Sequence, residues 1–153
     1  MSPLVSIIIP CFNAARWLPA TLESALAQTY AAREIIVIDD GSTDNSRTVA
    51  ESYADRGVRV VTQTNAGQGA ACNHGLRLAR GEYVKFFDAD DLLSPDMLVR
   101  QVTALGNHPG SLAYSEWARF HADPAEATFV PRPGWHDAAP VDWLVEILAD
   151  AQQ

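Results

Sequence analysis

The sequence has few basic residues, only two cysteines and no long apolar run. Its 153 residues include 11 Lys and Arg against 19 Asp and Glu, which gives a formal net charge of −8. An acidic chain without a basic cluster lacks the electrostatic footprint of a nucleic-acid-binding protein. We therefore expect no nucleic-acid partner. Since no apolar run approaches the roughly 18 residues that span a bilayer, we also expect no transmembrane segment.

The two cysteines, Cys11 and Cys72, lie in apolar contexts and lack the paired spacing of a zinc site. We therefore expect reduced thiols in a cytoplasmic protein. No basic segment precedes the first apolar run, as a secretory signal would require. The four histidines are spread along the chain, which also argues against zinc.

Short apolar runs alternate with helical patterns along the first two thirds of the chain. The expected strands are Val5 to Ile9, Glu34 to Ile38, Val58 to Thr62 and Tyr83 to Phe87. The expected helices run from about Arg16 to Gln28, around Val49 to Tyr53, from the loop at 65–69 through Leu78, and from Ser94 and Pro95 past Leu105. This order predicts an α/β fold with three layers and a mainly parallel central sheet.

Several residues between these elements are expected to act locally. Ser42 and Thr43 are typical helix caps, and Gly81 is placed to end the third helix. A lone lysine inside a strand, Lys85, is expected at a sheet edge. Beyond residue 107 the pattern weakens, with a further strand expected at Leu112 to Phe120 and a helix at Val141 to Ala149.

Carboxylates follow two of the expected strands. Asp39 and Asp40 come after the second strand, and Asp88, Asp90 and Asp91 come after the fourth. In an open α/β sheet, ligands bind at the carboxyl ends of the strands. Like charges gathered there raise one another's pKa unless a cation sits among them, and Mg²⁺ or Mn²⁺ prefers such oxygen ligands. The pattern predicts a divalent metal and a phosphate-bearing ligand.

Four ordered segments carry a family resemblance: VSIIIPCFN, IIVIDDGSTDNS, NAGQGAACNHG and FFDADD. Together, over about Leu4 to Leu105, the chain resembles the family-2 glycosyltransferases of the GT-A fold. The resemblance implies a Rossmann-like GT-A nucleotide-diphospho-sugar transferase fold. It also implies a donor-binding core at residues 1–106 and the start of an acceptor-side region at 107–153, with the fold incomplete at its carboxyl end.

The resemblance also implies roles for individual residues. Pro10, Phe12 and Asp40 would surround the nucleotide base, with Phe12 stacked on the ring and Asp40 accepting a ring N–H. Asp39 is expected to be structural. Asn65 and Gly67 would lie where a loop passes the nucleotide.

On the helix that follows, Asn73 matches the family pattern. Asp88 would bind the ribose hydroxyls, and Asp90 would hold the Mn²⁺ or Mg²⁺ that bridges the diphosphate. Asp91 is left open between a supporting role and the lead-in to the next helix.

The implied reaction is an inverting, metal-dependent transfer of a sugar from a nucleotide diphosphate sugar to a hydroxyl of a carbohydrate or lipid-linked carbohydrate acceptor. UDP is the favoured nucleotide, with GDP and dTDP left open. The general base matches no residue of this chain, since Asp137 and Asp142 fit no family motif. Peripheral attachment to the inner face of the membrane and a homodimer also stay open.

Alternatives remain at this point. A haloacid-dehalogenase-like phosphotransferase also carries DxD, but at its first strand, and a nucleotidyltransferase would begin with a glycine-rich basic loop that is absent here. A non-catalytic nucleotide-sugar binding module or an inactive fragment is the main competitor. Among the tryptophans, Trp17 and Trp143 are expected in the core, and Trp117 and Trp135 near an acceptor cleft.

Overall fold

The computed structural model describes residues 2–106, 108, 110–113, 115, 118–120 and 123–128. The chain divides into two compact units, Met1–Leu98 and Val99–Gln153. The expectations for Trp117, Trp135, Trp143 and the helix at Val141 to Ala149 lie outside the described residues. The assignment of a donor-binding core to residues 1–106 and of an acceptor-side region to residues 107–153 stays a prediction.

The first unit is built on a four-stranded parallel sheet of order β3-β2-β1-β4. Its strands are β1 (Val5–Cys11), β2 (Arg33–Asp39), β3 (Val58–Thr62) and β4 (Tyr83–Phe86). All seven residues of β1 are buried, as expected for a continuously apolar strand covered on both faces. The predicted α/β fold and parallel sheet are confirmed.

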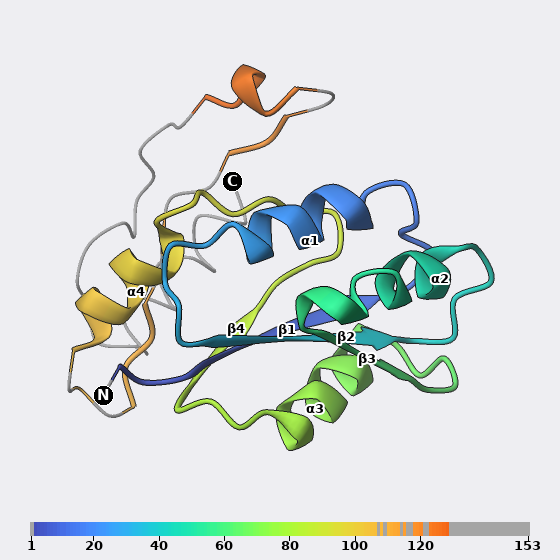
Figure 1. The fold of residues 1–153 in the computed structure, drawn as a ribbon, viewed down its shortest axis with the longest axis horizontal. Coiled ribbons are helices and arrows are strands. Elements are labelled where there is room, and N and C mark those ends of the chain that lie inside the picture. Colours follow the sequence, from blue (N-terminus) through green and yellow to red (C-terminus); the bar gives the residue numbers. More distant parts are fainter. Residues whose placement is uncertain are drawn as a thin grey trace, which may run out of the picture. The chain divides into compact units, whose positions relative to one another are not determined.

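Helices cover both faces of this sheet. Their bounds are α1 (Leu18–Leu26), α2 (Ser46–Glu51), the short 3-10 helix η1 (Ala54–Arg56) and α3 (Gln68–Leu78). Figure 1 shows α1 and α2 on one side of the strands and α3 on the other. These are the three predicted layers.

Two further elements follow β4. Helix α4 (Met97–Leu105) begins two residues after Pro95, so the expected start at Ser94 and Pro95 is too early. The 3-10 helix η2 (Pro124–Glu126) is the later one. The described residues within Leu112 to Phe120 form no strand, so that expectation is wrong for them. Within the described part of the chain, no helix is long and apolar enough to cross a membrane.

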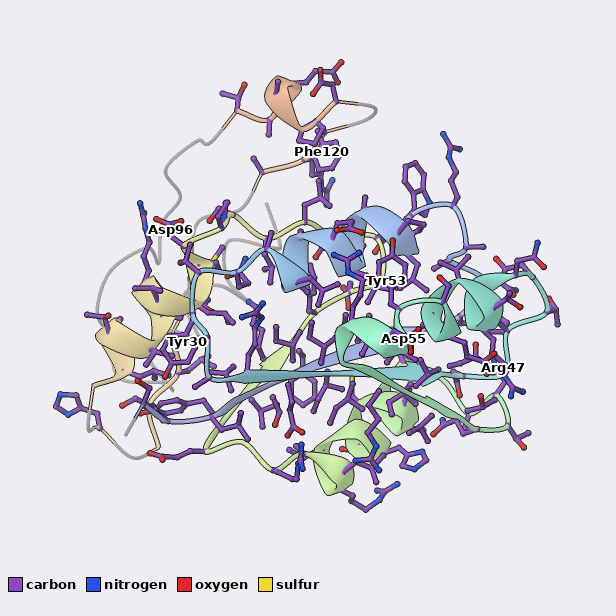
Figure 2. All side chains as sticks on the ribbon, viewed as in Figure 1. Tyr30, Arg47, Tyr53, Asp55, Asp96 and Phe120 are labelled. Atoms are coloured by element: carbon purple, nitrogen blue, oxygen red, sulfur yellow. The ribbon has the colours of Figure 1, made fainter. Side chains whose placement is uncertain are left out.

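Apolar side chains fill the space between the sheet and its helices (Figure 2). On the α3 side, Ile8, Ile36, Ile38 and Ala71 form one buried cluster. Helix α3 approaches this cluster through Gly75, where an added Cβ would collide with Cγ2 of Ile8 and lie 3.3 Å from Cγ1 of Ile38. The close approach of α3 to the sheet therefore requires a residue without a side chain at this position.

Gly81 does not end α3. The helix ends at Leu78 with the extended residue Ala79 as its C-cap. Gly81 instead passes against β1, where its N–H donates to Ser6 Oγ at 2.8 Å and an added Cβ would lie 2.6 Å from Ser6 N. The glycine is needed for a close approach between distant segments, which helix-end statistics do not detect.

We predict that Gly75→Ala destabilises the protein by about 1–3 kcal/mol, because the new methyl group overpacks a β-branched side chain of the central strand. Urea denaturation measures this loss. Gly69→Ala, in the first turn of the same helix with open space around it, is the control and should leave stability unchanged or raise it by up to about 1 kcal/mol. Equal stability of the two variants would contradict the packing argument.

Candidate nucleotide site

A cavity of about 460 Å³ opens at the edge of the sheet where β1, β2 and β4 end. Its lining comes from the end of β1, from the loops after these strands and from the first turn of α3. The lining residues are Pro10, Cys11, Phe12, Asn13, Ala14, Trp17, Asp40, Gln68, Ala71, Asp88, Ala89 and Asp90. The cavity thus lies where ligands bind in open parallel sheets.

Strand register explains why residues so far apart in sequence meet here. Cys11 pairs with Asp39 across β1 and β2, and the Asp40 N–H continues the ladder by donating to the Cys11 carbonyl at 2.8 Å. On the other side of β1, the Phe87 N–H donates to the Ile8 carbonyl at 3.0 Å. The residues that follow each strand therefore emerge at one edge.

Five of the eight residues expected to bind nucleotide or metal line this cavity. They are Pro10, Phe12, Asp40, Asp88 and Asp90. Asn65, Gly67 and Asn73 are exposed and do not line it. The binding roles of all eight stay predictions. Of the five carboxylates expected at this edge, three line the cavity, while Asp39 and Asp91 do not.

Asp40 is buried and is held by the loop between β3 and α3. Its Oδ1 accepts from Gln63 Nε2 at 2.7 Å and from the Ala66 N–H at 2.9 Å, and its Oδ2 accepts from the Gly67 N–H at 2.8 Å. Burial alone raises the pKa of Asp40, but these three hydrogen bonds outweigh it and hold the pKa below the ordinary value of 3.8. The expected rise from neighbouring carboxylates is therefore wrong for Asp40.

Two of the residues that donate to Asp40, Gly67 and Gln63, are themselves held in place. Gly67 has φ of +89°, in the left-handed region that disfavours a side chain, and it is the N-cap of α3. Gln63 is itself fixed, because its Oε1 lies 2.8 Å from His74 Nδ1. Since Gln63 donates through Nε2 to a carboxylate, its Oε1 is the acceptor and His74 Nδ1 the donor. The chain His74–Gln63–Asp40 orients the carboxylate.

The acidic residues after β4 are less restrained. Asp88 and Asp90 are both exposed, and Asp88 Oδ1 accepts from Gln68 Nε2 at 2.7 Å. The pKa of Asp91 is raised, first by burial and then by the negative charges of Asp88 and Asp90, against an opposing effect of Lys85. The expected effect of neighbouring like charges is therefore present at Asp91. Lys85 lies on β4, which is an edge strand of the sheet formed by the described residues.

Ser42 and Thr43 act between loops and not as helix caps. Ser42 Oγ accepts from the Asn13 N–H at 3.0 Å, and Asn13 Oδ1 accepts from the Thr43 N–H at 2.8 Å. Asn45 is the N-cap of α2 and makes no side-chain capping bond. Asp39 is structural in this arrangement, since its Oδ1 accepts from the Ser42 N–H at 3.2 Å. These bonds fix the loop after β1 to the loop after β2.

Trp17 is not a core residue. It occupies the N-cap position of α1, is 40% exposed and lines the cavity, with the Arg16 guanidinium 4.2 Å from its ring centroid. The helix begins at Leu18, with a proline in its first turn, so Trp17 precedes the regular helical pattern. Seven lining residues were not among the predicted binding residues, namely Cys11, Asn13, Ala14, Trp17, Gln68, Ala71 and Ala89. Of these, Trp17 had a signal in the sequence, because it stands directly before the expected Leu18 of the first helix.

The carboxylates of the cavity offer oxygen donors for a divalent cation. Among the described residues, no group of three or more His, Cys, Asp or Glu side chains is arranged to hold a metal. Mg²⁺ and Mn²⁺ need fewer, because they commonly take one or two carboxylates and complete their shell with water and substrate phosphate oxygens. The oxygen donors of Asp88 and Asp90 fit that pattern.

Comparison with known proteins places this geometry in context. Residues 6–144 match the family model described as "Glycosyl transferase family 2". An uncharacterized glycosyltransferase of Rickettsia typhi is 44% identical over 104 residues, covering 68% of this chain and 32% of the relative. The uncharacterized glycosyltransferase YibD of Escherichia coli is 47% identical over 95 residues, covering 61% of this chain and 28% of its own length. The chain thus spans about a third of the length of these relatives.

Solved structures show the same fold. Staphylococcus aureus TarS in complex with UDP-GlcNAc is similar with a TM-score of 0.65 and 30% identity, over 69% of this chain and 32% of that one. The mannosyltransferase PcManGT of Pyrobaculum calidifontis in complex with GDP-Man and Mn²⁺ has a TM-score of 0.66 and 31% identity, over 69% of this chain and 33% of that one.

We predict that Asp40→Asn lowers the stability at pH 7 by about 1–3 kcal/mol, because the amide NH2 group cannot accept a hydrogen bond and leaves at least one of the three donors without its partner. Urea denaturation measures the loss. The folded-state pKa is depressed, so the carboxylate's contribution is present above the unfolded pKa and is lost as the pH falls through the lower folded value. The difference from the unsubstituted protein should therefore shrink as the pH falls below 3.8.

Asp55→Asn is the control, at an exposed carboxylate in the segment after α2 (Figure 2). The stability of this variant should match that of the unsubstituted protein both at pH 7 and below pH 3.8. A loss at Asp40 that did not depend on pH would contradict the role of its ionised form.

Proposed function

The chain belongs to glycosyl transferase family 2, and we propose that the protein transfers a sugar from a nucleoside diphosphate sugar to an acceptor hydroxyl. The observation that carries this proposal is the cavity where half-exposed Phe12, buried Asp40 and the acidic loop with Asp88 and Asp90 meet. The similar structures that hold UDP-GlcNAc, or GDP-Man with Mn²⁺, support a donor of this class.

The hydrogen bonds of Asp40 favour a base with one ring N–H. A carboxylate offers about four lone-pair positions. Gln63 and Ala66 take two on Oδ1, and Gly67 takes one on Oδ2, which leaves one on Oδ2. Uracil presents a single N–H on its pairing edge, whereas guanine presents several. We therefore favour UDP over GDP, with Phe12 stacked on the ring and Pro10 beside it.

Charge in the cavity favours metal dependence. The lining residues include three carboxylates and no Lys, Arg or His. A diphosphate bound here would meet negative and neutral side chains and no positive one among the lining residues, unless a cation came with it. We propose that Asp90, beside Asp88, holds Mn²⁺ or Mg²⁺, and that Asp88 binds the ribose hydroxyls. A bound divalent cation would neutralise the charge that grows on the departing diphosphate.

The chain's own residues would bind and orient the donor. Asn65, Gly67 and Asn73 are kept as candidate contacts from the loop and from α3. We propose inversion at the anomeric carbon, which needs a base to take the acceptor proton, and we assign no residue of this chain to that step. The acceptor is proposed to be a carbohydrate or a lipid-linked carbohydrate. Cys11 and Cys72 are both free, which supports a reducing, cytoplasmic compartment.

Calorimetric titration of UDP tests the site. We expect binding in the presence of Mn²⁺ that is lost with EDTA and in Asp90→Ala, because the diphosphate then faces uncompensated carboxylates. Asp55→Ala, at an exposed carboxylate away from the cavity, should bind like the unsubstituted protein. Folded protein that binds neither UDP nor GDP nor dTDP in the presence of Mn²⁺ would refute the proposed donor site.

We also predict that Phe12→Ala weakens UDP binding by about 1–3 kcal/mol, the usual value of a base stacked on an aromatic ring. Phe12→Tyr should keep most of the affinity, because the ring remains. The matched control is Phe86→Ala, since Phe86 is 49% exposed against 51% for Phe12 but lies on β4 outside the cavity. Equal losses in Phe12→Ala and Phe86→Ala would argue against stacking at Phe12.

A further inference from the structure

Three polar side chains of α1 and of the residues just after it contact the segment after β4. Thr21 and Ser24 lie three residues apart on one face of α1, and Gln28 follows two residues after the helix ends at Leu26. Thr21 is fully buried and Gln28 is 4% exposed. All their partners in this segment are backbone groups within residues 89–98.

Thr21 contacts the backbone on both sides of Asp90. Its Oγ1 lies 2.9 Å from the Ala89 carbonyl oxygen and 2.9 Å from the Asp91 carbonyl oxygen. Because a hydroxyl carries one hydrogen, these two carbonyls share it, with the Trp17 carbonyl at 3.4 Å as a more distant third acceptor. The carbonyl groups of the two residues on either side of Asp90 are thereby held close to α1, while Asp90 itself lines the cavity.

Ser24 and Gln28 hold the rest of the segment. Ser24 Oγ accepts from the Leu93 N–H at 3.2 Å. Gln28 Nε2 donates to the Ser94 carbonyl at 2.7 Å, and its Oε1 accepts from the Leu98 N–H at 3.1 Å. The far end of the acidic loop is therefore anchored independently of Thr21, so that loss of the Thr21 hydroxyl should act mainly at residues 89–91.

We propose that Thr21 is a positioning residue, whose buried hydroxyl fixes the backbone around Asp90 so that this carboxylate points into the cavity and can hold the metal. The inference rests on the proposed function, because it takes Asp90 as the metal ligand. Residues that orient a metal ligand typically change metal affinity roughly 10- to 100-fold when they are replaced. Thr21 would do so without contacting metal or nucleotide.

Thr21→Val is the test, because it keeps the shape of the side chain and removes the hydroxyl. We expect the apparent Mn²⁺ dissociation constant, measured calorimetrically at fixed UDP, to rise roughly 10-fold or more. UDP affinity at saturating Mn²⁺ should stay near that of the unsubstituted protein. Thr21→Ser, which restores the hydroxyl, should return Mn²⁺ affinity towards the original value.

The matched control is Ser6→Ala, which also removes a buried hydroxyl with two hydrogen bonds, to Glu34 Oε1 at 2.6 Å and from the Gly81 N–H at 2.8 Å. Ser6 does not line the cavity, so this variant should lose stability without losing Mn²⁺ affinity. Hydrogen exchange should show faster exchange at residues 89–91 in Thr21→Val and not in Ser6→Ala. Should Thr21→Val not fold, Thr21→Ala replaces it, since water can then reach the two carbonyls.

The outcomes separate the two proposals. Unchanged Mn²⁺ affinity in Thr21→Val, or an equal loss in Ser6→Ala, would overturn the positioning role and leave the nucleotide site intact. Failure of Thr21→Ser to recover affinity would also overturn it. If the unsubstituted protein showed no Mn²⁺-dependent UDP binding, the proposed function would fail, and the inference that rests on it would fail with it.

Discussion

The whole site depends on the pairing of β1 with strands on both of its sides. Because β1 is buried along its length, its polar groups need partners within the protein, and parallel strands pair with its backbone on either edge. This pairing sets the register that brings Phe12, Asp40 and Asp88 to one end of the sheet. A slip of one residue would turn every β1 side chain to the opposite face of the sheet.

Register places the loops near one another, and side chains from neighbouring loops then fix them. Asn13 connects the loop after β1 to the loop after β2, and it adopts φ of +51°, a conformation that asparagine tolerates better than most residues. Asp40 holds the loop before α3, and Thr21 holds the acidic loop after β4. Each of these bonds joins segments that are distant in sequence. The walls of the cavity are therefore joined by the protein's own hydrogen bonds, and loops held in this way reduce the ordering cost of binding.

The fold could be predicted from the sequence because its signals are local. The β3 bounds match the expectation, and β2 differs by one residue at each end. Short runs rich in β-branched residues mark both strands, although only β2 is buried along most of its length. Sequence patterns gave wrong predictions where the role of a residue depends on a partner that is distant in the sequence. Ser42 resembles a cap but contacts Asn13, and Gly81 resembles a helix end but makes room for Ser6. Thr21 gave no signal at all, because its role depends on carbonyls about seventy residues away.

Two carboxylates of the same cavity are held in opposite ways, and this suits them to different tasks. Asp40 is buried, receives three hydrogen bonds and has a lowered pKa, so its charge is already balanced by donors of the protein. Asp90 is exposed, and its charge acts on its neighbour Asp91, whose pKa it helps to raise. A carboxylate whose charge is already stabilised by hydrogen-bond donors suits a single directional contact to a neutral base. A carboxylate without such donors suits a cation. The restraint on Asp90 falls on its backbone, through Thr21, and this leaves its oxygens available for a ligand.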